Sequence, residues 1–257
     1  MTEHVLVEKT DKILSLTLNR PEKKNALTRA MYKTLATQIT NADTDPDVRC
    51  ILLMAKGDMY TAGNDLADFA AVGNSAAAPQ PADANPLLPA LARSRKPIVA
   101  AVNGRAVGIG VTMLLHCDMV FLAEDALLTT PFVNLALVPE AASSILLPSR
   151  IGYVRAFEMF VLGEPVSAQQ AVSWGIANRV VPVADLHRVA RAAAVAIAAR
   201  APAAVGATKS LMRDEAAMLT RMGEEGGHFL HQLKSAEFKE AFSAFAERRP
   251  PDFSKFG

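Results

Sequence analysis

Two short loops in this sequence bring backbone N–H groups, rather than reactive side chains, to places where chemistry could occur. One contains Gly63-Asn64 and follows an apolar strand expected at 50–54; the other contains Gly108 and Gly110 and follows a strand expected at 98–102. Glycine lets a backbone approach a ligand closely, and a helix N-terminus leaves N–H groups without partners. If both strands belong to one sheet, these N–H groups could converge on one oxygen atom and stabilise negative charge on it, as an oxyanion hole does.

The second loop has two other interpretations. Its glycines could serve only close packing where a strand meets a helix. A dinucleotide site is the other, but the run from Gly108 to Met113 lacks the third glycine of the Rossmann fingerprint. It also lacks an acidic residue at the end of a following strand at the expected distance, so the pattern argues against that site.

The elements that must position these loops alternate in the manner of an α/β fold. Apolar runs at 5–7 and 13–18 predict a hairpin, Thr28 predicts the N-cap of a helix over 29–42, and a buried strand follows at 50–54. Strand, helix, strand is the unit from which α/β proteins are built. Further strands are predicted at 119–122 and 126–129, a helix start at Pro139-Glu140, and helices over 156–162, 167–173, 184–200, 202–233 and 236–247.

The segment after the first loop has an unusual composition. Asn64 or Asp65 could cap a short helix, and residues 72–90 then hold mainly Ala, Pro, Asn and Gly with Asp83 as their single charge. We expect a long loop there, which is either a lid over a site or a surface insertion.

Composition limits the classes of function. The chain has 257 residues, 51% hydrophobic, and a formal net charge of +1 with Lys and Arg scattered. This favours a globular protein with a large core and argues against nucleic acid or a membrane surface as the main partner. No apolar run approaches the roughly 18 residues of a membrane span, and no signal peptide is evident, so we expect a cytoplasmic location. Cys50 and Cys117 stand in apolar contexts, and we expect neither a disulfide nor a metal.

Four motifs carry a resemblance to a known family. They are Leu-Asn-Arg-Pro-Glu-Lys-Lys-Asn-Ala-Leu at 18–27, Ala-Gly-Asn-Asp-Leu at 62–66, Lys-Pro with Ala-Val-Asn-Gly-Arg-Ala-Val-Gly at 96–108, and Gly-Glu with Ser-Ala, Ala and Gly at 163–175. In this order they resemble the crotonase, or enoyl-CoA hydratase/isomerase, superfamily, over about residues 5–253.

The resemblance implies an α/β fold and a class of substrate. The implied architecture is a crotonase-like spiral of ββα units over 1–195 with a C-terminal helical region over 196–257, through which subunits form a homotrimer or hexamer. The implied substrate is an acyl-CoA thioester whose enolate the protein stabilises, so coenzyme A is part of the substrate and no separate cofactor is expected. The backbone N–H groups of Asn64 and Ile109 become the oxyanion donors. The implied substrate-binding positions are Lys24, Ala26, Ala62, Gly63, Asn64, Leu66, Gly108, Phe132 and Arg248.

The acidic residues indicate which reaction of the family to expect. Hydratases of the family use two glutamates, and this chain has Thr112 and Phe132 at those positions. Glu140 instead lies in a segment, 134–144, that resembles the Δ3,Δ2-enoyl-CoA isomerases. One carboxylate is enough for that reaction, because it can remove a proton from C2 and return it at C4. Apolar neighbours such as Leu137 and Val138 should raise the pKa of Glu140 and exclude water.

Several alternatives accompany this prediction of an isomerase in fatty-acid metabolism. Glu140 could be only an acid that stabilises a helix N-terminus. The protein could be a hydratase that uses Glu140 and a water molecule, or an acyl-CoA-binding protein without catalysis. Glu225 and His228 form one Glu-x-x-His motif, but a di-metal site needs a second copy, so a helix face is the better interpretation.

Overall fold

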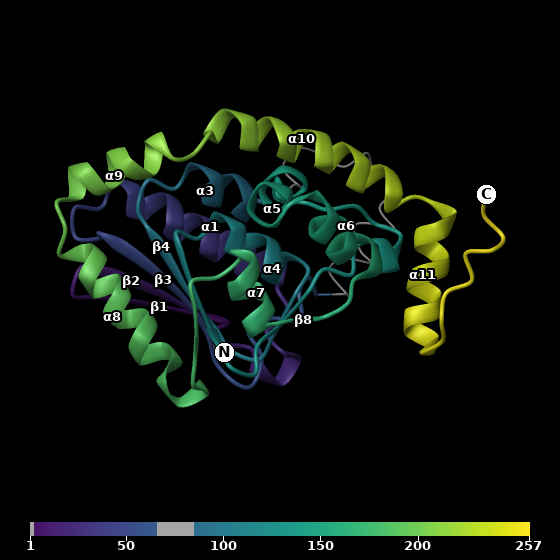
Figure 1. The fold of residues 1–257 in the computed structure, drawn as a ribbon, viewed down its shortest axis with the longest axis horizontal. Coiled ribbons are helices and arrows are strands. Elements are labelled where there is room, and N and C mark those ends of the chain that lie inside the picture. Colours follow the sequence, from purple (N-terminus) through teal and green to yellow (C-terminus); the bar gives the residue numbers. More distant parts are fainter. Residues whose placement is uncertain (1–2, 66–84) are drawn as a thin grey trace.

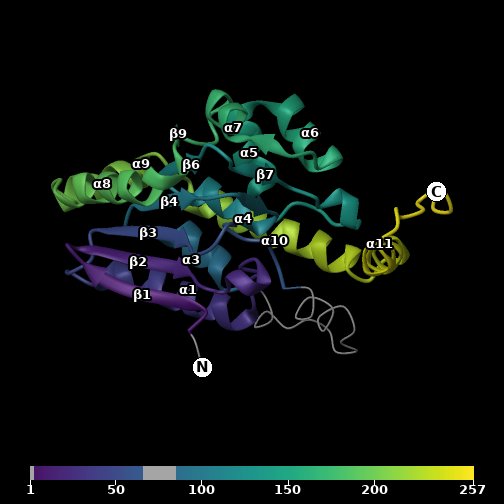
Figure 2. The same ribbon diagram turned by 90° about the horizontal axis from the view of Figure 1, so that it is seen from below.

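The computed structural model describes residues 3–65 and 85–257, and its strands form two sheets. The larger sheet has the order β1-β2-β3-β4-β6-β9 (Figure 2). β1 and β2 form the predicted antiparallel hairpin, and every other neighbouring pair in this sheet is parallel, so the carboxyl ends of β2, β3, β4, β6 and β9 meet at one edge. The strands are β1 (Val5–Thr10), β2 (Ile13–Leu18), β3 (Cys50–Ala55), β4 (Ile98–Val102), β6 (Met119–Ala123) and β9 (Arg179–Val181).

The second sheet is short, and its first strand was not expected from the sequence. The chain does not pass directly from the turn at Asn103-Gly104 into a helix, because β5 (Arg105–Val107) comes first and pairs in parallel with β7 (Leu127–Thr129). β8 (Val166–Ser167) pairs antiparallel with β7. The helix α4 (Ile109–Thr112) and the 3-10 helix η3 (Met113–His116) follow β5. A strand of three residues is too short to show as an apolar run in the sequence.

Helices cover both faces of the larger sheet and extend beyond it toward the C-terminus (Figure 1). Cys50 and Leu52 of β3 pack with the apolar side of α8, whereas Ile51 and Leu53 enter the main core. This alternation confirms a strand buried on both faces. The helices are α1 (Arg29–Thr44), α3 (Leu87–Arg93), α5 (Ser143–Ile151), α6 (Tyr153–Leu162), α7 (Ala168–Trp174), α8 (Leu186–Ala198), α9 (Pro202–Leu211), α10 (Glu215–Gln232) and α11 (Ala236–Glu247), with 3-10 helices η1 (Pro21–Lys23), η4 (Val133–Leu135) and η5 (Val183–Asp185).

The helix predicted over 202–233 is two helices. α9 ends at Leu211, and the Asp214 side chain accepts a hydrogen bond of 2.9 Å from the backbone N–H of Ala217. Asp214 therefore caps a new helix, α10. Apolar residues continue on both sides of the break, so periodicity alone could not locate it.

The loop that carries Glu140 also differs from the prediction. α5 begins at Ser143 rather than at Pro139, and Ala141 and Ala142 precede it with φ angles of 64° and 56°. Two consecutive residues in the left-handed region interrupt any helix that would start at Pro139. Glu140 is therefore a loop residue, and the helix start predicted at Pro139-Glu140 is wrong.

Most of the predicted loop at 72–90 lies outside the described residues, as do Leu66 and the short helix expected after Asn64. The last part of that segment is helical, because α3 begins at Leu87. The Asn85 side chain accepts a hydrogen bond of 3.0 Å from the Leu87 N–H at this start. The lid hypothesis falls on undescribed residues and stays a prediction.

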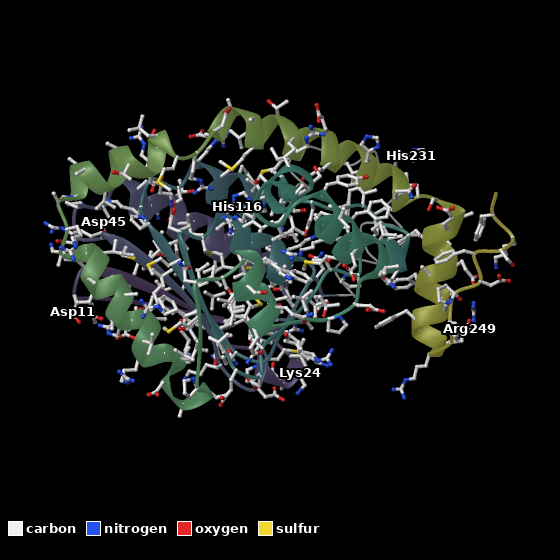
Figure 3. The ribbon with its side chains drawn as sticks, viewed as in Figure 1. Asp11, Lys24, Asp45, His116, His231 and Arg249 are labelled. Carbon is white, nitrogen blue, oxygen red and sulfur yellow. The ribbon has the colours of Figure 1, made fainter. Side chains whose placement is uncertain are left out.

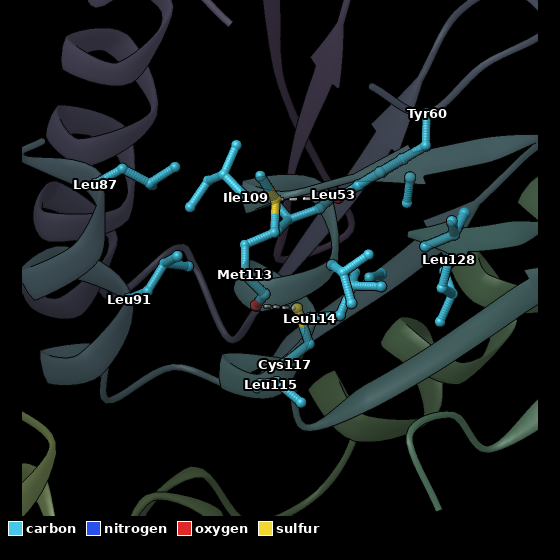
Figure 4. Packing of buried hydrophobic residues seen from close by; sticks show 14 of the residues in the cluster. Leu53, Tyr60, Leu87, Leu91, Ile109, Met113, Leu114, Leu115, Cys117 and Leu128 are labelled. Atoms are coloured by element: carbon cyan, nitrogen blue, oxygen red, sulfur yellow. Dashed lines mark hydrogen bonds between the residues drawn. The ribbon is translucent and has the colours of Figure 1, made fainter. Parts of the chain in front are cut away.

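The main hydrophobic core extends from α4 and η3 to the C-terminal helices. Figure 4 shows Ile109 and Met113 in this core with Leu87 and Leu91 of α3. Phe238 of α11 belongs to the same cluster. The division at residue 195 stays a prediction.

Among the helices of residues 3–65 and 85–257, none is individually long and apolar enough to cross a bilayer. One pair, Val183–Ala198 with Pro202–Leu211, has sufficient length and apolar composition only when taken together, and it is bent by 105°.

Candidate active site

A parallel bridge between Thr61 and Ala106 holds the two glycine-containing loops side by side. The Thr61 N–H donates to the Arg105 carbonyl at 3.2 Å, and the Val107 N–H donates to the Thr61 carbonyl at 3.1 Å. Asn64 lies three residues after Thr61, and Ile109 lies three residues after Ala106. The two predicted oxyanion donors therefore occupy equivalent positions on adjacent chain segments.

The hydrogen bonds of the described residues show whether the two predicted donors are available. Within the described residues, the backbone N–H groups of Asn64 and Ile109 donate no hydrogen bond. Both are therefore available to a ligand oxygen.

Two glycines make the close approach of these loops feasible. Gly63 has a φ of 89°, and a Cβ there would lie 3.0 Å from the Val107 carbonyl oxygen. A Cβ on Gly110 would collide with the Thr61 methyl group. Larger residues at either position would separate the loops and displace the donors.

The motif at 18–27 holds the Asn64 loop in place through hydrogen bonds of Asn25. Asn25 is fully buried, its Nδ2 donates to the carbonyls of Lys56 and Met59 at 2.8 and 2.7 Å, and its own carbonyl accepts from the Thr61 hydroxyl at 2.7 Å. The Thr61 hydroxyl in turn accepts from the Gly63 N–H at 3.0 Å. The motif at 18–27 thus acts on the candidate site through the backbone geometry of residues 61–63.

Tyr32 of α1 is a site residue that the sequence analysis did not identify. It is buried, and its hydroxyl donates to Asn64 Oδ1 at 2.6 Å. Burial and then the charge of Glu140 raise the pKa of Tyr32 well above its usual value. The sequence offered only its position beside Met31 on the buried side of the helix, which is also typical of a core residue.

Glu140 has the properties of a group that exchanges protons near neutral pH. Its Oε1 atom is buried and has no hydrogen-bond partner among the described residues. Burial, and then the charge of Glu225, raise the pKa of Glu140 to about 7. Phe132, whose ring centroid lies 6.2 Å from that of Phe160, and Leu137 are both buried in the same segment. A carboxyl group in such surroundings can act as base and acid in turn.

The other predicted binding residues lie at different distances from this centre. Lys24 is exposed and forms an ion pair of 2.8 Å with Asp58, while its carbonyl accepts from the Ala62 N–H. Ala26 is half-buried in the same loop. Arg248 is exposed and ends α11, whose contacts are with η4. Figure 3 shows the adjacent Arg249 beside α11 and Lys24 on the lower side of the view, and the binding role of Arg248 stays a prediction.

The positions of the two hydratase glutamates hold residues that cannot transfer a proton near neutral pH. Thr112 is buried in α4, and Phe132 is buried beside η4. Among residues 3–65 and 85–257, no group of three or more His, Cys, Asp or Glu side chains is arranged to hold a metal ion. Among the residues predicted for the site, Glu140 is the one with a side-chain pKa near neutral pH.

Comparison with known proteins gives a consistent picture. Residues 8–255 match the enoyl-CoA hydratase/isomerase family. The chain is 33% identical to 1,2-epoxyphenylacetyl-CoA isomerase and 32% identical to 2,3-dehydroadipyl-CoA hydratase, both from Escherichia coli K12, with alignments that cover 99% of both chains for the first and 97% and 98% for the second. It is 41% identical to an enoyl-CoA hydratase/isomerase from Pseudoalteromonas atlantica T6c of known crystal structure, with a TM-score of 0.92 over 98% of this chain and 100% of that one.

These matches span nearly the whole chain and agree with the fold. The crystal structure shares its mixed α/β architecture and its C-terminal helices, as the resemblance of the four motifs implied. The relatives' names include both an isomerase and a hydratase, so they fix the family and leave the reaction open. The protein is therefore a member of the enoyl-CoA hydratase/isomerase, or crotonase, family.

Proposed function

We propose that this enzyme converts 3-enoyl-CoA thioesters to 2-trans-enoyl-CoA thioesters. Glu140 carries the proposal, because it combines a buried carboxyl oxygen without a partner and a pKa raised to about 7. Tyr32 links Glu140 to the first loop electrostatically, since its hydroxyl donates to Asn64 Oδ1 and the charge of Glu140 contributes to its raised pKa, and this supports placing Glu140 at the site.

The reaction needs one base and one anion-binding site. The Glu140 carboxylate removes a proton from C2, and the electrons of the broken C–H bond move into the thioester as a dienolate. The N–H groups of Asn64 and Ile109 stabilise the charge on the thioester oxygen. The Glu140 carboxylic acid then donates the same proton to C4, the double bond moves from C3–C4 to C2–C3, and the enzyme returns to its starting state.

Hydration is less well supported by this set of residues. Adding water across a double bond requires a group to activate the water and a group to protonate C2. Thr112 and Phe132 supply neither. Glu225, another acidic residue near Glu140, has both carboxylate oxygens engaged by backbone N–H groups. We further propose that Lys24 and the 62–64 backbone contact the coenzyme A portion, which remains part of the substrate.

The test compares two reactions and two variants. Purified enzyme should isomerise a 3-enoyl-CoA much faster than it hydrates a 2-enoyl-CoA. Glu140→Gln should lower isomerase kcat by a factor of about 10²–10⁴ or more. Acyl-CoA affinity should change little, because only the group that carries the proton is lost. The control Glu8→Gln changes an exposed glutamate of β1 and should retain full activity.

Each alternative has its own outcome in this test. Rapid hydration by the wild type would favour a hydratase that uses Glu140 and water. Binding of acyl-CoA without turnover of either substrate would favour a non-catalytic binding protein. Full isomerase activity in Glu140→Gln would show that another group is the base.

A further inference from the structure

We propose that Glu225 of α10 is a positioning residue for Glu140, because its carboxylate clamps two backbone N–H groups of the loop that carries the base. This inference rests on the proposed role of Glu140 in isomerisation. It concerns a residue that lies 83 positions beyond the loop in sequence and on a different helix.

The clamp is direct and buried. Glu225 Oε2 accepts a hydrogen bond of 2.6 Å from the Ala142 N–H, and Oε1 accepts one of 2.9 Å from the Ser144 N–H. The residue is only 6% exposed. Both oxygens are engaged by charge-assisted hydrogen bonds, which are stronger and shorter than neutral ones. Glu225 is thereby suited to holding the loop and is not itself available as the base.

The loop needs such support because its backbone is unfavourable without it. Ala141 and Ala142 follow Glu140 directly and have φ angles of 64° and 56°, which side chains with a Cβ rarely adopt. Strained residues persist only where their surroundings hold them. The clamped N–H groups flank the first residue of α5, where a negative charge is also favoured by the helix dipole.

A second contact holds the carbonyl end of the same 141–142 peptide unit whose N–H group donates to Glu225. Arg213 donates to His116 Nδ1 at 3.2 Å, and a guanidinium can only donate, so Nδ1 is the acceptor and Nε2 carries the hydrogen. His116 Nε2 then donates to the Ala141 carbonyl at 2.8 Å. Burial lowers the pKa of His116 to about 3, so the ring stays neutral under ordinary conditions. Figure 3 shows His116 in the interior of the molecule.

The charge of Glu225 has a separate effect from its geometry. Burial raises the pKa of Glu225 in spite of its two N–H partners, and its negative charge contributes to the raised pKa of Glu140. Polar groups on three elements face this pair. Tyr32 comes from α1, and neutral His116 comes from η3, where its ring accepts a hydrogen bond from Arg213. Arg221 lies on α10, and its positive charge lowers the pKa of Glu225, which opposes the effect of burial. Removing the charge of Glu225 should therefore lower the pKa of Glu140.

The experiment measures the titration of Glu140 apart from turnover. Protein labelled with ¹³C at the glutamate carboxyl carbons is titrated by NMR, and Glu140→Gln assigns the Glu140 signal. In Glu225→Gln the midpoint of that signal should move to lower pH. Isomerase kcat should fall roughly 10- to 100-fold with KM nearly unchanged, because one N–H group loses its acceptor and the base is displaced. Glu215→Gln, at an exposed glutamate in the first turn of the same helix, is the control and should change neither readout.

Three outcomes separate this inference from the proposed function. If the wild type has no isomerase activity but Glu225→Gln shifts the Glu140 titration, the isomerase proposal fails and the influence of Glu225 on Glu140 stands. An unchanged titration and unchanged kcat in folded Glu225→Gln would overturn the inference. If Glu225→Gln does not fold, Glu225→Asp decides: its shorter side chain cannot reach both N–H groups, so kcat should fall while KM holds, and an undiminished kcat overturns the inference.

Discussion

Burial gives Glu140 a titration range that suits proton transfer under ordinary conditions. A carboxyl group in water ionises near pH 4.5, whereas the pKa of Glu140 is raised to about 7. A stronger base results, and its conjugate acid still returns the proton readily. The same shift carries a cost for folding, because the ionised form is disfavoured inside the protein.

The raised pKa predicts the pH dependence of the reaction. Isomerase kcat/KM should rise about tenfold per pH unit up to a midpoint near pH 7 and then level, because only ionised Glu140 can remove the C2 proton. Initial rates between pH 5 and 9 with a 3-enoyl-CoA measure this. A midpoint near pH 4.5 would show that the carboxyl group is solvated during catalysis.

A second prediction concerns stability. Since the pKa of Glu140 is higher in the folded than in the unfolded chain, its favourable contribution is complete below about pH 4.5 and is lost as the pH rises through about 7. Glu140→Gln has no charge to bury, so it should raise the free energy of unfolding above pH 7 by about 1–3 kcal/mol relative to the wild type. Urea unfolding at pH 5 and pH 8 checks this. Equal differences at both values would contradict it.

At the scale of elements, the candidate site depends on two short loops, and hydrophobic periodicity predicts some of the elements around them but not others. The hairpin, α1 with its Thr28 cap, and the buried strands were predictable because their patterns extend over several residues. β5 and the break between α9 and α10 were not, since each depends on a few residues and on partners distant in sequence. The loop glycines indicated a close approach, but only the bridge of Thr61 to Ala106 shows which segments meet.

The element that supplies one donor can be tested through the backbone. Ile109→Pro removes the N–H at the first position of α4, where proline fits a helix. It should lower isomerase kcat about 10²- to 10³-fold with little loss of acyl-CoA affinity. Ile109→Val keeps the N–H and most of the side chain, and it should remain active. Equal loss of binding and turnover in the proline variant would argue against an oxyanion role.

Over the whole molecule, a residue of a C-terminal helix, Glu225, holds the loop that carries Glu140, and the sequence analysis did not foresee this contact. Glu225 was considered only as part of a metal motif, because its partners Ala142 and Ser144 offer backbone groups that leave no trace in residue type. The apolar residues of α8 and Phe238 of α11 pack against the chain's own core. Exposed apolar side chains gather on α6, at Tyr153, Val154 and Phe157.

We propose that these exposed residues contribute to a homotrimer or hexamer in solution. Large apolar side chains exposed together on one helix are typical of a contact surface between subunits. Sedimentation velocity at micromolar concentration should give a mass of three or six subunits, and Val154→Asp should reduce it. A monomeric wild type would remove the proposal.

The N–H groups of Asn64 and Ile109, which donate no hydrogen bond within residues 3–65 and 85–257, have a consequence for mutational scanning. In a library of all amino acids at position 109, charged, polar and very large residues should fail because the side chain is buried in the main core, and proline should fail because it lacks the N–H group, so the position would be scored as an ordinary packing site. The sensitivity should appear next to it, at Gly63 and Gly108, whose φ angles of 89° and 56° most side chains resist. In a fitness map of this enzyme, the proposed oxyanion hole would therefore be easier to recognise from these two glycines than from the residues that carry the proposed donors.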